Sequence, residues 1–387
     1  MINPMISISP ILQRMMDKAK NLVLLALDQL LMLCYQPGTA GGVVLIRLDN
    51  IGDFILWLDT AKIYRQFYQD QKITLVASAS WAELAGALPY WDEIIVLNPR
   101  SLYNNRMYRW KHLRQLRRYG FETAIQPNYS REFFVDSLIN VIGASRRIGS
   151  RGDSSNIPLW QKRISDRWYT QLIVADSDAK MELERNAEFI SNLTGSQHIA
   201  SLPMLPLITS LPEHLMIGQA YFIVFPGASW HGRQWSAEQF ALTAQTLCHK
   251  KKLRIVICGG PDDLAICAKI ARIIGGDAID LSGQTTLLEL IELIRLSNFL
   301  ISNETSAIHI AAAVRVPSIC ILGGGHFGRF MPYPSELGQA MNYVFHQMPC
   351  FGCNWQCTQP HFANEEMPCI KAVTVEQVCD AVHQLSR

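Results

Sequence analysis

The sequence predicts an α/β protein with two Rossmann-like, doubly wound parallel-sheet domains that face a central cleft. A chain of 387 residues exceeds one ordinary compact core. Short apolar runs alternate with amphipathic stretches in two series, 43–141 and 221–322, and the segment 199–212 between them carries three prolines. We therefore expect a helical extension at 1–40, domains at 41–210 and 211–346, and a Cys-rich segment with a C-terminal helix at 347–387.

Composition excludes several classes of protein. Hydrophobic residues make up 49% and charged residues 18% of the chain, which is typical of a globular protein. A formal net charge of +2 is too small for the domain-wide basic face of a nucleic-acid-binding protein. Five of the ten cysteines lie singly in apolar stretches, which fits buried thiols in a reducing cytoplasm.

The N-terminal segment predicts an amphipathic helix. Ala19, Leu22, Ala26, Leu30 and Leu33 share one face at helical spacing. Charged and polar residues interrupt the apolar run well short of the roughly 20 residues that cross a bilayer, so we expect neither a membrane span nor a signal peptide. The helix either packs on the body of the protein or lies on the inner leaflet as a peripheral anchor.

Residues of functional interest should follow the strands, because open α/β sheets bind ligands at the carboxyl ends of their strands. The first predicted strand ends in Arg47-Leu-Asp-Asn-Ile-Gly-Asp53. Gly52 permits a tight turn, and Asp53 falls at the start of the next helix, where an N-cap is the ordinary role of an aspartate. No Gly-x-Gly-x-x-Gly motif follows this first strand, so the dinucleotide fingerprint is absent there.

Two further motifs follow strands of the second series. After Phe225 come small residues up to Ser229 and then Arg233, a permanent cation suited to an anion. The next motif contains Gly259, Gly260 and Asp263. Asp263 either caps the following helix or accepts a hydrogen bond from a ribose hydroxyl, as acidic residues do in nucleotide folds.

The fourth motif is Ile301-Ser-Asn-Glu304-Thr305-Ser306-Ala307-Ile-His309. Here a helix N-terminus offers backbone N–H groups at about residues 305–307 together with its positive dipole end. This arrangement predicts a seat for a diphosphate. His309 lies one turn further in, and it is either a buried, satisfied histidine or part of the site.

Three other groups of residues have structural and functional interpretations. Asp176-Ser-Asp178 has the spacing of a metal-binding acidic pair, but it precedes a helical stretch and is better explained by helix capping. The tail can hold structural Zn²⁺ in a Cys₄ site or form disulfides through Cys350, Cys353, Cys357 and Cys369. The basic stretch 106–118 predicts a solvated helix.

Taken together, the four motifs in this order resemble those of glycosyltransferase family 9, the bacterial heptosyltransferase family of GT-B fold. The resemblance runs from about residue 43 to 382 and includes Gly323-Gly-Gly325 after a later strand. It implies inverting, metal-independent transfer from a nucleotide sugar, typically ADP-heptose, to the lipopolysaccharide core or another cell-surface glycan. It also implies Asp53 as the base, Arg233 on the donor phosphates, Asp263 at the ribose, and Thr305, Ser306 and His309 in the donor loop.

Two departures from the family pattern concern the sugar rather than the reaction. Glu304 stands where the family usually has aspartate, and Ser306-Ala307 where it usually has Gly-Pro. The resemblance further implies a lipid-linked acceptor and work in the cytoplasm at the inner face of the plasma membrane, without a catalytic cofactor or nucleic acid. Because the acceptors of this family are anionic and membrane-bound, the resemblance offers a second interpretation of the basic stretch 106–118 as a patch for lipid or acceptor phosphate, for which the candidates are Arg47, Arg109 and Arg114. Rival hypotheses on the same frame are a sugar-nucleotide epimerase or hydrolase and a catalytically silent nucleotide-sugar-binding protein.

Overall fold

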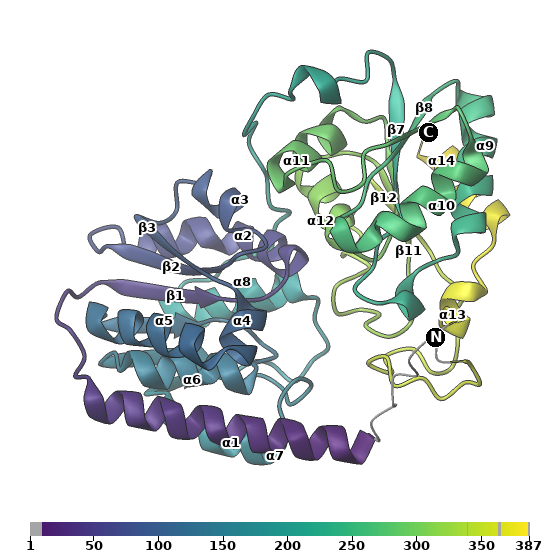
Figure 1. The fold of residues 1–387 in the computed structure, drawn as a ribbon. Helices are drawn as coiled ribbons and strands as arrows, with labels where there is room; N and C mark the ends of the chain where they lie inside the picture. Colours follow the sequence, from purple (N-terminus) through teal and green to yellow (C-terminus); the bar gives the residue numbers. More distant parts are fainter. Residues whose placement is uncertain (1–9, 339, 363–364, 386–387) are drawn as a thin grey trace. The chain divides into compact units, whose positions relative to one another are not determined.

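The computed structural model describes residues 10–338, 340–362 and 365–385. The chain divides into two compact units, each of which contains one six-stranded sheet (Figure 1). The first unit comprises residues 1–48, 65–82 and 89–175, and the second comprises 49–64, 83–88 and 176–387. The two parallel sheets confirm the predicted doubly wound α/β class.

The sheet of the first unit has the strand order β3-β2-β1-β4-β5-β6, and every neighbouring pair is parallel. This is the order of the doubly wound fold, in which the connections pass in opposite directions from a central strand. The central strand, β1, is buried along its whole length. The strands are β1 Val43–Arg47, β2 Ile73–Ser78, β3 Glu93–Leu97, β4 Thr123–Gln126, β5 Arg146–Ser150 and β6 Gln171–Ile173.

Helices cover this sheet and begin and end at recognisable caps. The Asn105 side chain accepts a hydrogen bond from Tyr108 N at the start of α5, and Gly120 ends the helix with a φ of 77°. The helices of the first unit are α1 Pro10–Cys34, α4 Pro99–Asn104, α5 Arg106–Tyr119, α6 Phe133–Ile142 and α7 Leu159–Ser165. Two more, α2 Ile51–Phe67 and α3 Ala82–Gly86, cross the division of the chain.

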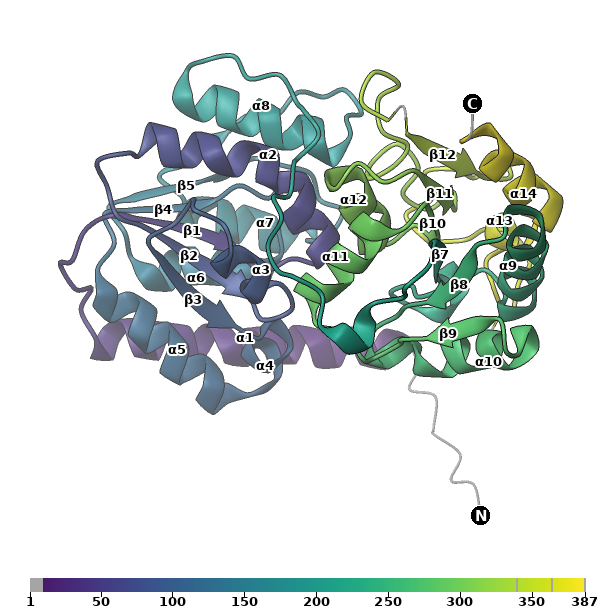
Figure 2. The ribbon, with the colours of Figure 1, turned by 90° about the horizontal axis from the view of Figure 1, so that it is seen from above.

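The sheet of the second unit has the order β12-β11-β10-β7-β8-β9, again parallel throughout. Figure 2 shows these strands following one another in this order, from β12 to β9. The strands are β7 Tyr221–Phe225, β8 Arg254–Ile257, β9 Ala278–Asp280, β10 Leu300–Asn303, β11 Ser318–Ile321 and β12 Met341–Val344. The helices are α8 Glu182–Thr194, α9 Ala237–Lys251, α10 Leu264–Ile274, α11 Leu287–Leu296, α12 Ser306–Ala313, α13 Pro368–Lys371 and α14 Val375–Gln384.

The C-terminal helix is part of the second core. Val378 and Val382 of α14 pack in one buried cluster with Phe222 of β7 and with Trp235 and Phe240 at the start of α9. The indole N–H of Trp235 donates to Val373 O at 2.9 Å, which satisfies the one polar atom of a fully buried ring. The chain end therefore stabilises the strand from which one of the functional loops departs.

A buried ion pair attaches α1 to the first unit. Asp28, which breaks the apolar run of this helix in the sequence, is 3% exposed. It accepts a hydrogen bond from Arg109 Nε at 2.8 Å, and Arg109 Nη2 also donates to Ser137 Oγ at 2.6 Å. Arg117 Nη1 donates to Val141 O at 2.7 Å, at the end of α6. Two arginines of the basic stretch are thus fixed inside the packing of α1, α5 and α6.

We predict that Arg109→Met lowers the free energy of unfolding by about 3–5 kcal/mol, because it leaves the buried Asp28 carboxylate without its cation. Urea unfolding followed by circular dichroism measures the change. Lys111→Met, an exposed change on the same helix, is the matched control and should cost less than about 0.5 kcal/mol. Equal losses in the two variants would contradict this account of α1.

Candidate functional site

Arg233 lies at the meeting point of two loops of the second unit. It ends a short 3₁₀ turn, His231–Arg233, after β7. Its Nη1 donates to Ser229 Oγ at 3.1 Å, and its Nη2 donates to Glu304 O at 3.1 Å, just beyond the end of β10. Because β7 and β10 are paired and parallel, both loops leave the same edge of the sheet. The sheet therefore brings the second and fourth sequence motifs together.

The Glu304 carboxylate forms an ion pair with the same arginine. Its Oε2 lies 3.3 Å from Arg233 Nη2, and the side chains are 5% and 15% exposed. Burial raises the pKa of Glu304 to about 7, although the positive charge of Arg233 acts in the opposite direction. The charge of this pair consequently changes close to neutral pH, and the guanidinium has an anionic partner that a ligand phosphate can replace.

Asn303 holds the two loops in register. This fully buried side chain accepts a hydrogen bond from Trp235 N at 3.1 Å and donates to Pro226 O at 2.7 Å. Both partners belong to the loop between β7 and α9, whereas Asn303 ends β10. A buried amide that satisfies backbone groups of a neighbouring loop fixes the loop conformation, because any movement leaves these groups unpaired.

The start of α12 only partly matches the expected row of open amides. Thr305 is the N-cap, and its hydroxyl accepts a hydrogen bond from Ala307 N at 3.3 Å. Glu304 N donates to Ile321 O at 3.2 Å, within the sheet. Two of the backbone N–H groups around this turn are therefore used inside the protein. The positive end of the α12 dipole still lies at Thr305 and Ser306, beside Arg233.

His309 is buried and hydrogen-bonded. Its Nδ1 lies 2.8 Å from the Tyr333 hydroxyl, and the side chain is 4% exposed. Burial, together with the positive charge of Arg233, lowers the pKa of His309 to about 3, so the imidazole is neutral at physiological pH. A Cβ at Gly52 would lie 2.9 Å from Cδ2 of this ring, so only glycine fits there. The turn before Asp53 therefore lies against His309.

Asp263 lies between two glycine loops. Its Oδ2 accepts a hydrogen bond from Gly260 N at 2.9 Å, which is the helix-capping role expected from the sequence. A Cβ at Gly227 would come within 2.3 Å of the same oxygen, and a Cβ at Gly259 within 2.8 Å of Asp263 Cβ. The glycines thus admit a half-buried carboxylate to the edge of the sheet that also carries Arg233. Burial raises its pKa.

Trp355 forms a wall of the site that the sequence did not reveal. Its ring lies 4.8 Å from the Arg233 guanidinium carbon, a cation–π distance. Asn354 and Trp355 have φ values of 50° and 61°, a left-handed conformation that is unfavourable for side chains of this size. A Cβ at Gly325 would meet the Trp355 ring at 2.2 Å, so the glycine-rich loop after β11 makes room for the indole.

The same packing accounts for part of the Cys-rich segment. Gly352 N and Asn354 N donate to Gly324 O and Gly325 O at 2.7 and 2.9 Å, and Gly324 N donates to Cys369 Sγ at 3.4 Å. Cys350, Cys353, Cys357 and Cys369 are free thiols. Burial raises the pKa of Cys369, and the nearby Cys353 and Cys350 raise it further. In the part of the chain that the structure describes, no three His, Cys, Asp or Glu side chains are arranged to hold a metal ion.

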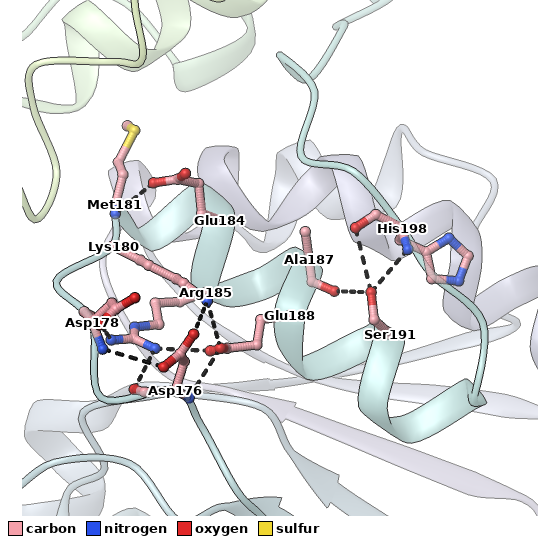
Figure 3. A network of polar contacts seen from close by, with 10 residues as sticks. All are labelled: Asp176, Asp178, Lys180, Met181, Glu184, Arg185, Ala187, Glu188, Ser191 and His198. Carbon is pink, nitrogen blue, oxygen red and sulfur yellow. Dashed lines mark hydrogen bonds and ion pairs between the residues drawn. The ribbon is translucent and has the colours of Figure 1, made fainter.

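Asp176 and Asp178 stabilise the region before α8 (Figure 3). Asp176 Oδ2 lies 3.0 Å from Lys180 Nζ, and Asp176 N donates to Glu188 Oε1 at 3.0 Å. Arg185 of α8 donates to the backbone oxygens of both aspartates. The bond from Lys180 lowers the pKa of Asp176. The helix-capping prediction for this acidic pair is wrong: the N-cap of α8 is Met181, whose N donates to Glu184 Oε2 at 2.9 Å, and the Asp176 carboxylate binds Lys180 instead.

The three arginines proposed for an acceptor patch belong to the first unit. Arg47 is fully buried at the end of β1, and Arg109 is held by Asp28. The Arg114 guanidinium carbon lies 4.6 Å from the centre of the Tyr35 ring. All three contribute to packing inside this unit.

Sequence reasoning missed three side chains of the site, for different reasons. Asn303 stood inside a quoted motif but was given no role. Tyr333 and Trp355 lie 24 and 46 residues beyond His309, in segments without helix or strand periodicity. The sequence offered one signal for Trp355. Three glycines follow one another at 323–325, and glycines in a row indicate that another group closely approaches the backbone.

Comparison with known proteins identifies the family. A family model described as glycosyltransferase family 9 (heptosyltransferase) matches residues 109–359, which is more than half of the chain. The chain belongs to glycosyltransferase family 9. The match includes Arg233, Asp263, Glu304 and His309, whereas Asp53 lies outside it.

Individual proteins agree with membership of glycosyltransferase family 9. The chain is 22% identical over 310 residues to lipopolysaccharide heptosyltransferase 3 of Escherichia coli, covering 77% of this chain and 88% of that protein. The fold is similar to ADP-heptose lipopolysaccharide heptosyltransferase II of E. coli, with a TM-score of 0.66, 17% identity, and 89% and 98% of the two chains covered. It is also similar to TibC of enterotoxigenic E. coli, described as a dodecameric iron-containing heptosyltransferase, with a TM-score of 0.55, 16% identity, and coverage of 91% and 78%. The protein is therefore a heptosyltransferase-like glycosyltransferase.

We predict that the unfolding free energy of the wild type falls as the pH rises through about 7, and that Glu304→Gln removes this fall. A carboxyl whose pKa is raised on folding stabilises the fold at low pH, and this contribution is lost as pH rises to about 7. Relative to the variant, the wild type should lose on the order of 3 kcal/mol of unfolding free energy between pH 5 and 8. Urea unfolding at each pH measures the difference.

The control for this prediction is Glu238→Gln on α9. Its bond to Lys269 lowers the pKa of the exposed Glu238, so its contribution should be constant above pH 5. Residues that the wild type and the variant share, including His309, contribute equally to both unfolding free energies, so their contributions cancel in the difference between the two proteins. A flat difference between wild type and Glu304→Gln would show that Glu304 is already ionised at pH 5.

Proposed function

We propose that this glycosyltransferase moves a heptose or a related sugar from a nucleotide donor, typically an ADP-sugar, to a lipopolysaccharide core or another cell-surface glycan. The transfer inverts the anomeric centre and needs no metal. The observation that carries the proposal is the position of Arg233, a fixed cation at the carboxyl edge of a parallel sheet, beside the N-terminus of α12. The solved relative in the family acts, by its description, on ADP-heptose.

The donor diphosphate would occupy the turn 304–307 and Arg233. Glycosyl transfer passes through an oxocarbenium-like state while negative charge grows on the departing diphosphate. A guanidinium held by Ser229 and Trp355 and the positive end of α12 stabilise this charge without reorganising. Asp263, after the neighbouring strand β8, would accept hydrogen bonds from the ribose, and Gly227 and Gly259 leave space for its side chain.

Asp53 would remove the proton from the acceptor hydroxyl as the new bond forms. It lies in the first turn of α2, and the preceding Gly52 lies against His309 within the second unit. This proximity supports a common site for Asp53 and the donor turn. One base is sufficient for inversion, since the acceptor oxygen attacks from the side opposite the leaving diphosphate. His309, neutral and bonded to Tyr333, would position this turn rather than transfer a proton.

Two further parts of the proposal concern cofactor and location. We assign a structural purpose to the Cys-rich segment, because its backbone and Cys369 hold the glycine loop against Trp355. If Cys350, Cys353, Cys357 and Cys369 bind a metal ion such as Zn²⁺, it would support this packing and take no part in transfer. The acceptor would be lipid-linked, and the enzyme would work in the cytoplasm at the inner face of the plasma membrane.

A donor screen combined with one variant tests the function. We expect one ADP-, GDP-, UDP- or dTDP-sugar to raise the melting temperature, with the ADP-sugar as the first candidate. Asp53→Ala should keep this stabilisation but lower kcat at least about a hundredfold, because it removes only the general base. Asp70→Ala on the surface is the control. If no nucleotide sugar stabilises the protein, the proposal fails; if Asp53→Ala turns over normally, the base is a different residue.

We also predict a graded pair of effects around Arg233. Arg233→Ala should lower kcat/KM for the donor about tenfold to a hundredfold, because it removes charged hydrogen bonds. Glycine tolerates the positive φ at position 355. Trp355→Gly should lower kcat/KM for the donor about threefold to thirtyfold, because it frees the arginine. Because Trp355 acts through Arg233, the double variant should equal Arg233→Ala alone. Additive effects would show that the indole contacts the donor itself, and Phe362→Ala is an exposed control.

A further inference from the structure

We infer that the first unit docks on an anionic lipid bilayer through an apolar and basic surface formed by α1 and α7, here called the α1/α7 surface. It consists of Leu22, Val23, Leu30 and Leu33 of α1 and Leu159, Trp160, Arg163, Ile164 and Arg167 of α7 and the turn after it. The inference goes beyond the proposed transfer reaction and does not depend on which sugar or acceptor the enzyme uses.

Over residues 19–34, the side of α1 that faces away from α5 and α6 is largely apolar. Asp28 and the buried Leu24 and Leu31 form the side that packs against α5 and α6. Leu22 and Leu33 lie on the opposite side at helical spacing and are 59% and 81% exposed. The apolar stripe recognised in the sequence is thus the solvent side of this helix. A large exposed apolar stripe on a protein surface indicates a binding partner.

A second helix repeats this arrangement. On α7, Gln161 and Ser165 are buried, while Leu159 and Trp160 are 63% and 40% exposed and Ile164 is exposed one turn later. The helix has only seven residues and lies against α6, which also packs against α1. Figure 1 shows α1 and α7 along the same side of the first unit, beyond the layer of α5 and α6. The two apolar faces therefore belong to one side of this unit.

The charges on this surface favour an anionic partner. Arg163 and Arg167 are exposed among the apolar residues of α7. The acidic residue between them, Asp166, is bound by Arg131 and by Lys162, so it does not offset the arginines at the surface. Tryptophan with arginine around an apolar helix face is the pattern of helices that lie in the bilayer interface. Basic side chains near such a face are attracted to anionic headgroups.

A bilayer fits this surface better than a second copy of the chain. In a two-fold dimer this surface packs against its own copy, and because its residues include two arginines and no carboxylate, the dimer would bury positive charge without an acidic partner. No described helix is long and apolar enough to span a membrane, so the contact would be shallow and lie along the helix axes. Such a contact needs several side chains acting together, because a single leucine or tryptophan gives only weak partitioning.

Vesicle binding by the full chain tests the inference. We expect the protein to co-sediment with vesicles of equal parts phosphatidylglycerol and phosphatidylcholine, more weakly at high salt and more weakly with phosphatidylcholine alone. Leu33→Glu and Trp160→Glu should each weaken binding about tenfold. Arg163→Gln and Arg167→Gln should each weaken binding about fivefold on the phosphatidylglycerol vesicles and leave binding to phosphatidylcholine unchanged.

The matched control is Leu242→Glu, which places the same charge on an exposed leucine of α9 in the second unit. It should bind vesicles like the wild type. Donor-induced thermal shifts, measured on every variant, show whether the fold and the donor site are intact, so failure of the docking inference is distinguishable from failure of the proposed function. Unchanged vesicle binding by the Leu33→Glu, Trp160→Glu double variant overturns the inference. A wild-type dimer in light scattering that Leu33→Glu converts to a monomer also overturns it, in favour of a second copy.

Discussion

The arrangement of the candidate donor site depends on how one guanidinium is held. Arg233 is placed by a hydroxyl, a backbone carbonyl, a buried carboxylate and an indole ring, and these groups come from three separate loops of the second unit. A planar, permanently charged group with several fixed donors suits such a junction better than a flexible ammonium. Each loop is positioned partly by its contact with this residue, so the site and its supporting packing are one system.

Close backbone approach is the second constraint on the site. Gly227 and Gly259 admit Asp263, Gly325 admits Trp355, and Gly52 admits His309. A methyl group at any of these glycines would overlap a neighbouring side chain, so the functional groups meet at distances that other residues would prevent. The same close packing holds His309 neutral and raises the pKa of Glu304 to about 7, because both are withdrawn from water. Burial thus sets the charge state of the site as well as its shape.

The two units use buried charge for different purposes. In the first unit, Asp28 and Arg109 join α1 to α5 and α6, and the exposed residues of α1 between 19 and 34 are largely apolar. An acidic residue in the middle of an apolar helix therefore determines which side packs and which side is exposed. In the second unit, Glu304 and Arg233 lie at the edge of the sheet, where a ligand phosphate can take the place of the carboxylate. Similar pairs thus attach a helix in one case and join two loops of the candidate donor site in the other.

The sequence by itself determined the class of fold, the family and the loops that carry the candidate donor site. Alternation of buried strands and amphipathic helices indicated two doubly wound sheets, and motifs after β7, β8 and β10 indicated where their carboxyl ends carry polar groups, because these signals are local. Residue contacts across the chain were decided only by tertiary structure. Periodicity grouped Leu22 with Leu33 but could not tell that this face is exposed, since the partner of Asp28 lies 81 residues away. The roles of Trp355 and Tyr333 likewise required the packing of distant segments, because nothing in their local sequence encodes a neighbour.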